Sequence, residues 1–345
     1  IDPEQAARQG RRLTEFCRET EAGLDCRYPA PDELVFGVSI GGEARAYPLR
    51  ILNWHELLND VVGVTDRQVA LVYCTLCGSA ILYDTSVGPV TYTDPRTGAR
   101  VTLDKGALEF GTTGLLMRSN KLMYDRETLT VWNAMTGRPA FGPLAEVEDL
   151  VLEKLPVVVT DWSSWYAAHP NTTVLSLRTG YDRDYTNSAA YRTYFDDRTS
   201  LMFPVWRREE HALQPKEMVF GLESTGARKA YPLEALVASS VVNDRVGNQT
   251  VVLVARATPE REFFEPGGAA VRAYQRGNRR FTSGPDDRVV IDEDNRKWRV
   301  TEEALVGPSG ARFERLPGHL SFWFGWSAFH PETEVYSPTT GEAYD

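Results

Sequence analysis

Three side chains in the N-terminal half of the chain have the types and spacing of a metal or redox centre. Cys74 and Cys77 form a Cys-x-x-Cys pair in "YCTLCGSA", and His55 precedes them in "ILNWHELL". Gly78 permits a tight turn after the pair, so two thiolates can converge on one point. Two thiolates and an imidazole form a soft, open ligand set that suits copper, or zinc if a fourth ligand closes it. We therefore predict a metal centre of His55, Cys74 and Cys77 that holds copper, with zinc or no metal as alternatives.

The surroundings of these residues could supply a further ligand and a substrate surface. Met123 is the candidate for a methionine ligand, which would favour copper. An open position on the metal would admit oxygen or a substrate, with His55, Cys74 and Cys77 as catalytic residues of a copper-dependent oxidase or oxygenase. Whether the protein is an enzyme stays open at this point. The predicted surface for a small-molecule or peptide substrate consists of Arg118, Asn120, Tyr124 and Asp125.

Two other functions fit the same residues. In a thiol–disulfide redox protein, Cys74 would attack, Cys77 would resolve, and His55 would lower the pKa of the attacking thiol. Such pairs usually begin a helix, whereas a strand is expected after this one. In a non-enzymatic protein, the pair would hold a structural zinc ion that stabilises the fold.

The chain contains an internal duplication. "PDELVFGVSIGGEARAYPL" at residues 31–49 returns as "PKEMVFGLESTGARKAYPL" at residues 215–233, and the match continues without a gap to Gly63 and Gly247. Later segments also correspond, such as "WYAAHPNTTVLS" and "WSAFHPETEVYS". A repeat of this length indicates two related domains.

Comparison of the two copies separates scaffold from site. Trp165 with Trp326, and His169 with His330, occur in both copies, so we interpret them as packing and turn residues. In contrast, His55 corresponds to Ser239, Cys74 to Arg256 and Cys77 to Pro259. The joint loss of all three residues indicates that they share a task in the first copy, and that the second copy is a degenerate, structural partner.

The predicted architecture is mainly β, α+β with few short helices, in two tandem duplicated sandwich-like or barrel-like domains. We expect an N-terminal extension at 1–30, a first repeat at 31–177, an aromatic-rich interdomain segment at 178–214 and a second repeat at 215–345. The interdomain segment is too aromatic for a flexible linker, so it should pack across both halves.

Two short helices are expected in the first repeat. One, over residues 50–58, would direct His55 inward toward the strands that carry the cysteines. The other, in "TDWSSWYAAHP", would end at Pro170.

Charge and hydropathy narrow the classes of partner. The chain has 38 Lys and Arg residues against 48 Asp and Glu, a net charge of −10, which disfavours binding to nucleic acid. It has no apolar run long enough for a membrane-spanning helix. Cys17 and Cys26 could form a disulfide in an oxidising compartment. Since the sequence begins at Ile1, a signal or anchor could have been removed upstream, and we predict an extracytoplasmic protein.

Several quoted segments also resemble a known bacterial family. "VFGVSIGGEARAYPLRILNWHELLND", "VALVYCTLCGSAILYD", "GLLMRSNKLMYDRETLTVWNAMTGRP" and "WYAAHPNTTVLS" are similar to domain of unknown function 3179. The resemblance covers roughly residues 31–337. It implies an exported bacterial protein, and it implies no particular activity. It also sets Met117 apart, because similar sequences commonly carry an aromatic residue there.

Overall fold

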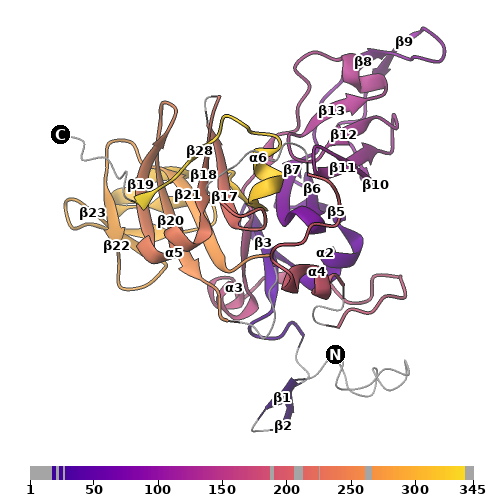
Figure 1. Cartoon of the computed structure of the whole chain (residues 1–345). Helices are drawn as coiled ribbons and strands as arrows, with labels where there is room; N and C mark the ends of the chain where they lie inside the picture. Colours follow the sequence, from indigo (N-terminus) through magenta and orange to yellow (C-terminus); the bar gives the residue numbers. More distant parts are fainter. Residues whose placement is uncertain are drawn as a thin grey trace.

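The computed structural model describes residues 18–20, 23–25, 28–186, 190–205, 213–224, 226–260 and 266–338. The chain is mainly β with a few short helices, so the predicted fold class is confirmed (Figure 1). A small hairpin of β1 (Arg18–Thr20) and β2 (Gly23–Asp25) forms a sheet of its own. The predicted Cys17–Cys26 disulfide lies outside the described residues.

The second repeat contains a nearly closed, barrel-like sheet of eight strands. Its order is β19 (Val241–Val246), β20 (Gln249–Ala257), β21 (Ala269–Gln275), β26 (Arg312–Leu316), β25 (Ala304–Val306), β24 (Lys297–Val300), β23 (Val289–Asp292) and β22 (Phe281–Ser283). The two edge strands meet through Asn243 of β19. Its side-chain amide donates to the carbonyl oxygen of Phe281 at 2.7 Å and accepts from the Phe281 N–H at 2.8 Å.

The first repeat has the same strands in two four-stranded sheets. One is β14 (Lys154–Leu155), β7 (Ser79–Asp84), β6 (Arg67–Cys74) and β5 (Leu57–Val62); the other is β10 (Phe110–Met117), β11 (Asn120–Asp125), β12 (Val131–Asn133) and β13 (Arg138–Phe141). Asn59 of β5 bonds to Phe110 of β10 as Asn243 does to Phe281, at 2.8 and 2.9 Å. An additional hairpin, β8 (Val90–Thr93) and β9 (Arg100–Leu103), projects from this half at the upper right of Figure 1.

Each repeat also has a smaller four-stranded sheet in which the last strand pairs in parallel. The first repeat uses β15 (Val158–Asp161), β3 (Leu34–Ile40), β4 (Glu43–Pro48) and β16 (Thr173–Val174). The second uses β27 (His319–Phe322), β17 (Met218–Ser224), β18 (Ala227–Pro232) and β28 (Glu334–Val335). The short helices are α2 (Leu49–His55), α3 (Trp162–Ala168), α4 (Arg192–Asp196), α5 (Leu233–Ser239) and α6 (Trp323–Ser327), with 3-10 turns η2 (Thr75–Cys77), η3 (Pro143–Glu146) and η4 (Pro308–Gly310).

The contacts that stabilise the two repeats are also matched. Trp132 donates its indole N–H to buried Asp125 at 2.8 Å, and Trp298 donates to buried Asp292 at 2.9 Å. A buried indole N–H needs an acceptor, and these two carboxylates supply it. Asp125 and Asp292 therefore have the same structural role in the two repeats.

The tryptophans that follow β15 and β27 pack on glycines. A Cβ at Gly37 would lie 2.3 Å from the Trp165 ring, and one at Gly221 would lie 2.1 Å from the Trp326 ring. Only glycine leaves room for the indole at these two positions.

The two repeats share one apolar core. The main cluster of buried residues contains side chains from β3 and β6 of the first repeat and from β17, β20 and β27 of the second. β15 packs against β21 of the other repeat, and β27 packs against β7. Each repeat therefore places its late strand on the large sheet of the other.

The aromatic interdomain segment packs into this core, with Tyr185, Tyr194 and Phe195 buried in the main cluster. Its burial explains the high aromatic content that the sequence shows there.

The structure corrects the predicted helix over residues 50–58. α2 ends at His55, because Glu56 has φ +58°, in the left-handed region, and β5 begins at Leu57. The spacing of three and four residues that placed His55 on an inward face with Leu58 therefore does not exist.

Candidate redox site at Cys74 and Cys77

Cys74 and Cys77 are held on either side of a tight turn. β6 ends at Cys74, η2 ends at Cys77, and Gly78 turns the chain into β7 with φ +59°. The glycine is also needed for space, because a Cβ there would lie 3.2 Å from the Phe322 ring. The two cysteines form a disulfide, with their Cα atoms 5.2 Å apart.

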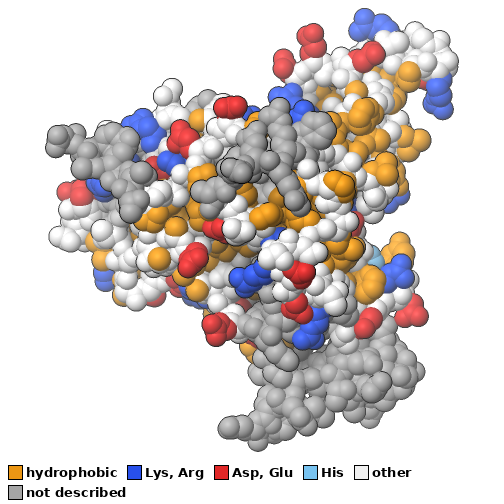
Figure 2. Space-filling view, in the orientation of Figure 1, with side chains coloured by type: hydrophobic (Ala, Val, Ile, Leu, Met, Phe, Trp, Pro, Cys, Tyr) orange, Lys and Arg blue, Asp and Glu red, His pale blue; other side chains and the backbone are white. Residues whose placement is uncertain are grey.

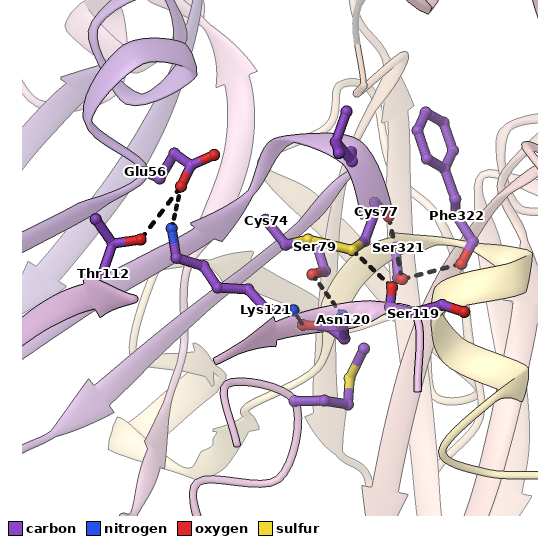
Figure 3. The surroundings of a disulfide bond; sticks show 12 residues. Glu56, Cys74, Cys77, Ser79, Thr112, Ser119, Asn120, Lys121, Ser321 and Phe322 are labelled. Carbon is purple, nitrogen blue, oxygen red and sulfur yellow. Dashed lines mark hydrogen bonds and ion pairs between the residues drawn. A yellow bond between two sulfur atoms is a disulfide. The ribbon is translucent and has the colours of Figure 1, made fainter. Parts of the chain in front are cut away.

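The disulfide is covered by the second repeat. Cys74 is 4% exposed and Cys77 is 0% exposed. The hydroxyl of Ser321 lies 3.5 Å from the Cys77 carbonyl oxygen (Figure 3). A Cβ at Gly325 of α6 would lie only 3.2 Å from the Cys77 Cβ. The pair therefore lies at the junction of the two halves.

The turn between β10 and β11 meets the disulfide from the other side. The carbonyl oxygen of Ser119 lies 3.0 Å from Cys77 Sγ, and Asn120 donates to the Ser79 hydroxyl at 3.2 Å (Figure 3). The disulfide has no sulfur-bound hydrogen, but a reduced Cys77 thiol would donate to this carbonyl. Of the predicted substrate residues, Asn120 is thus beside the sulfurs, while the Arg118 guanidinium lies over the Phe329 ring at 6.0 Å.

A partly buried ion pair lies near the disulfide. The Lys121 ammonium is paired with the Glu56 carboxylate, to which Thr112 also donates at 3.4 Å (Figure 3). Burial lowers the pKa of Lys121, because the ammonium is removed from water, and the charge of Glu56 opposes this shift. This pair was not predicted from the sequence. The duplication marks only Glu56, which corresponds to Ser240, because Lys121 corresponds to another cation, Arg288.

His55 is positioned by tyrosines of the interdomain segment. Its Nε2 is hydrogen-bonded to the Tyr185 hydroxyl, and its ring lies 5.2 Å from the Tyr181 ring and 5.7 Å from the Tyr185 ring. The Tyr185 hydroxyl is also within 2.6 Å of the Thr179 hydroxyl. Burial, and then the charge of Arg183, lower the pKa of His55.

The remaining predicted residues belong to the scaffold around the site. Met123 is fully buried in a second apolar cluster with Trp132, separate from the cluster that contains the cysteines. Tyr124 packs over Gly111, where a Cβ would lie 2.6 Å from its ring. Asp125 accepts from the backbone N–H of Thr128 at 2.5 Å and from Trp132, so its carboxylate is engaged in the turn.

Among the described residues, no group of three or more His, Cys, Asp and Glu side chains is placed to hold a metal ion. The two sulfurs are bonded to each other, and His55 is bonded to Tyr185. The predicted metal shell is therefore not assembled in this arrangement, and copper and zinc stay predictions from the sequence.

The interdomain segment covers the turn that carries the pair. The Tyr194 hydroxyl donates to the carbonyl oxygen of Leu76, between the two cysteines, at 2.7 Å. Lys216 contacts this tyrosine in two ways. Its ammonium lies over the ring, 3.4 Å from the centroid, and donates to the Tyr194 carbonyl oxygen at 2.6 Å. The tyrosine therefore ties the covering segment to the Cys-x-x-Cys turn.

The chain belongs to the family described as "Protein of unknown function (DUF3179)", whose model matches residues 18–333. The family expected from the quoted motifs is thus confirmed over nearly the whole chain. No curated protein and no solved structure matches the chain. In the part of the chain that is described, no helix is long and apolar enough to cross a membrane.

Proposed function

We propose that the protein is a thiol–disulfide redox protein whose centre is the Cys74–Cys77 pair. The observation that carries this proposal is the disulfide itself, formed by two cysteines that occur in one copy of a duplicated unit and lie at the junction of the copies. A pair needed only for the fold would be expected in both copies. Its loss from the second copy, which keeps the same strands, favours a chemical role.

The stabilisation that this disulfide can provide is small. A bond that closes a loop of four residues constrains the unfolded chain by only about 2 kcal/mol in the chain-entropy treatment. Structural disulfides that close long loops reach roughly twice that value. Loop closure is therefore a weak reason for this bond to exist.

The reaction is a two-electron exchange. In the reduced protein, the Cys74 thiolate attacks one sulfur of a substrate disulfide and displaces the other sulfur as a thiolate, which takes up a proton. The Cys77 thiolate then attacks Cys74 Sγ, the mixed disulfide breaks, and the second substrate sulfur leaves as a thiol. The protein dithiol is oxidised and the substrate disulfide is reduced; with a substrate dithiol and an oxidised protein, the same steps run in reverse.

We propose a polypeptide as the substrate, for which the β10–β11 hairpin offers a docking surface. Leu115 of this hairpin is 62% exposed, Leu116 is also exposed, and Ser119 of the same hairpin touches Cys77 Sγ. Figure 2 shows hydrophobic side chains gathered on this half of the molecule. Exposed apolar groups that adjoin a reactive pair fit a peptide partner.

The test is a redox titration under native conditions. Protein equilibrated in buffers of graded thiol–disulfide potential would be alkylated, and the peptide containing Cys74 and Cys77 would be quantified by mass spectrometry. We expect the two thiols to appear together and reversibly while the fold persists. In Cys74→Ser, Cys77 should be alkylated at every potential, because it has no partner for a disulfide. The same variant should no longer reduce a peptide disulfide.

Two outcomes would contradict the redox proposal. One is that the thiols become accessible only in denaturant, as for a purely structural bond. The other is a stoichiometric metal in the reduced protein that Cys74→Ser removes, which would support the copper or zinc centre instead.

The covering tyrosine should control how fast the pair reacts. We expect Tyr194→Phe to increase the rate of native-state reduction by about 5-fold, because loss of the bond to the Leu76 carbonyl removes roughly 1 kcal/mol that holds the cover closed. Tyr231→Phe is a matched control, since its hydroxyl donates to Asp244 at 2.9 Å in the second repeat, away from the turn. Equal acceleration in both variants would indicate general destabilisation and would refute the role of Tyr194.

We also propose that this chemistry takes place outside the cytoplasm. A disulfide persists in an oxidising compartment, whereas cytosolic thiols are kept reduced. Fractionation of the native organism, with the protein detected by antibody, would test this; recovery in the cytoplasmic fraction alone would contradict it.

A further inference from the structure

The second repeat has its own version of the position that the disulfide occupies in the first. The residues just before Cys74 and Arg256 each donate a backbone hydrogen bond at 2.8 Å to the carbonyl of the left-handed residue that ends the preceding helix, Glu56 and Ser240 respectively. Arg256 therefore takes the place of Cys74 in the fold. The correspondence inferred from the sequence across a gap has this structural basis.

A second pair of residues also corresponds. Lys121 and Arg288 each stand two positions before the residue paired with the matched tryptophan, Trp132 or Trp298. Lys121 lies near the disulfide, and Arg288 lines the same cavity as Arg256. A cationic side chain is therefore present at the disulfide and at the corresponding position of the second repeat.

A cavity of about 410 Å³ lies beside Arg256, at the position in the second repeat that corresponds to the disulfide in the first. It is bounded by α3 of the first repeat and the large sheet of the second. Its lining includes Ser164, His169, Arg256, Arg272, Arg288 and Arg299. Four guanidinium groups therefore line one cavity, although the net charge of the chain is −10.

Two of the four arginines form ion pairs with carboxylates. Arg256 is paired with Asp161 at 2.6 Å and with Asp287 at 2.7 Å, and Arg272 is paired with Glu302 at 2.5 Å. These ion pairs hold the walls of the cavity in place.

The other two guanidinium groups carry uncompensated charge. Among the described residues, the Arg288 guanidinium donates only to the carbonyl oxygen of Ala167, at 3.4 Å, and Arg299 forms no ion pair with any carboxylate. Both side chains are exposed, and neither guanidinium would have to break an ion pair with a described carboxylate to meet a ligand. Guanidinium groups bind carboxylate and phosphate oxygens through paired, parallel hydrogen bonds.

We propose that this cavity is a binding site for a small oxyanion, held by Arg288 and Arg299 between the ion-paired walls that Arg256 and Arg272 provide. The site is independent of the redox proposal. The second repeat then has a binding role of its own instead of a purely structural one, and the two related positions have diverged to a disulfide and an anion site.

Calorimetric titration of the purified full-length protein, with inorganic phosphate in one series and succinate in another, tests this proposal. The buffer should be low in chloride, because salt screens exposed charges. We expect saturable binding of at least one anion, and the stronger of the two identifies the class as phosphate or dicarboxylate. Arg288→Gln and Arg299→Gln should each weaken it by roughly 10-fold or more, as expected for loss of a charge-assisted hydrogen bond.

These two variants are chosen because their side chains are exposed and outside the buried ion pairs, so the fold should persist. Arg312→Gln is the control, since Arg312 is an exposed cation beside Glu314 that does not line the cavity, and it should not alter binding. The proposal is overturned if neither anion saturates the protein, or if binding is unchanged in both Arg288→Gln and Arg299→Gln. Retention of binding in Cys74→Ser is expected, which separates this result from the redox test.

Discussion

Replacing Glu33 with glutamine is expected to lower the free energy of unfolding by about 3–5 kcal/mol, the cost of breaking a buried ion pair on one side. Glu33 and Arg50 are both buried, and the Arg50 guanidinium meets the carboxylate in a bidentate pair, at 2.5 and 2.6 Å. Glutamine keeps the shape of the side chain but removes its charge. The guanidinium would then remain buried without a counterion.

This pair also anchors the segment that positions the candidate site. The remaining Arg50 nitrogen donates to the carbonyl oxygen of Tyr185 at 3.1 Å, and the hydroxyl of the same tyrosine bonds to His55. Glu33→Gln should therefore also expose Cys74 and Cys77 to reductant faster than in the parent protein.

The second repeat offers a matched control. Glu217 occupies the position of Glu33 and likewise accepts from a turn N–H, that of Gln214 at 3.2 Å, but Glu234 replaces the arginine. Glu217→Gln should cost less than about 1 kcal/mol, as for a single exposed hydrogen bond. Urea unfolding followed by fluorescence measures both variants, and equal losses would refute the role of the ion pair.

The fold could be predicted from the sequence because its signals are local and repeated. Alternating and apolar runs such as those of β6 and β7 predicted strands, and the duplication let each copy support the other. The end of α2 was missed, because the left-handed residue there is glutamate, which local sequence rules do not mark as a helix stop. Its counterpart Ser240 has the same φ of +58°. The shared conformation is therefore set by the fold and not by residue type.

The candidate site was predictable in part. The Cys-x-x-Cys spacing placed Cys74 and Cys77 on one turn, but spacing alone does not distinguish a disulfide from a metal ligand set. The orientation of the His55 ring is set by its contact with Tyr185, more than a hundred residues away, and no local sequence pattern predicts that contact. Lys121 was invisible for the same reason, since its partner Glu56 is distant in sequence.

A group of buried histidines between the repeats should make the protein sensitive to acid. His319 and His330 are 4% and 3% exposed, and they face the Glu223 carboxylate and the Lys154 ammonium, which form an ion pair at 2.5 Å. Burial lowers the pKa of His330 from its ordinary value of 6.5 to about 4, with Glu223 opposing the shift. Burial also lowers the pKa of His319 well below its ordinary value.

The direction of the pH effect follows from these shifts. Because the folded pKa values lie below the unfolded ones, the unfolded chain binds more protons, so stability is full above pH 6.5 and falls as the pH decreases toward 4. For His330 alone, the loss is about 2 kcal/mol at pH 5 and about 3 kcal/mol at pH 4. His319 adds to this loss. Burial raises the pKa of Glu223, but the charges of Lys154 and His330 outweigh burial and lower it to about 2. Protonation of this carboxylate therefore adds a further loss of stability below pH 4.5.

Urea unfolding at pH 7.5, 5.5 and 4.5 measures this dependence. The free energy of unfolding should fall steeply between the first and the last condition, and His330→Gln should flatten the slope by the share assigned to His330, because glutamine does not titrate. The slope is compared instead of the absolute stability, so any cost of the substitution at pH 7.5 cancels. An unfolding free energy that is constant over this range, or an unchanged slope in His330→Gln, would show that these imidazoles do not control stability. A steep slope that His330→Gln flattens would show that these imidazoles, buried between the two repeats, set the acid sensitivity of the fold.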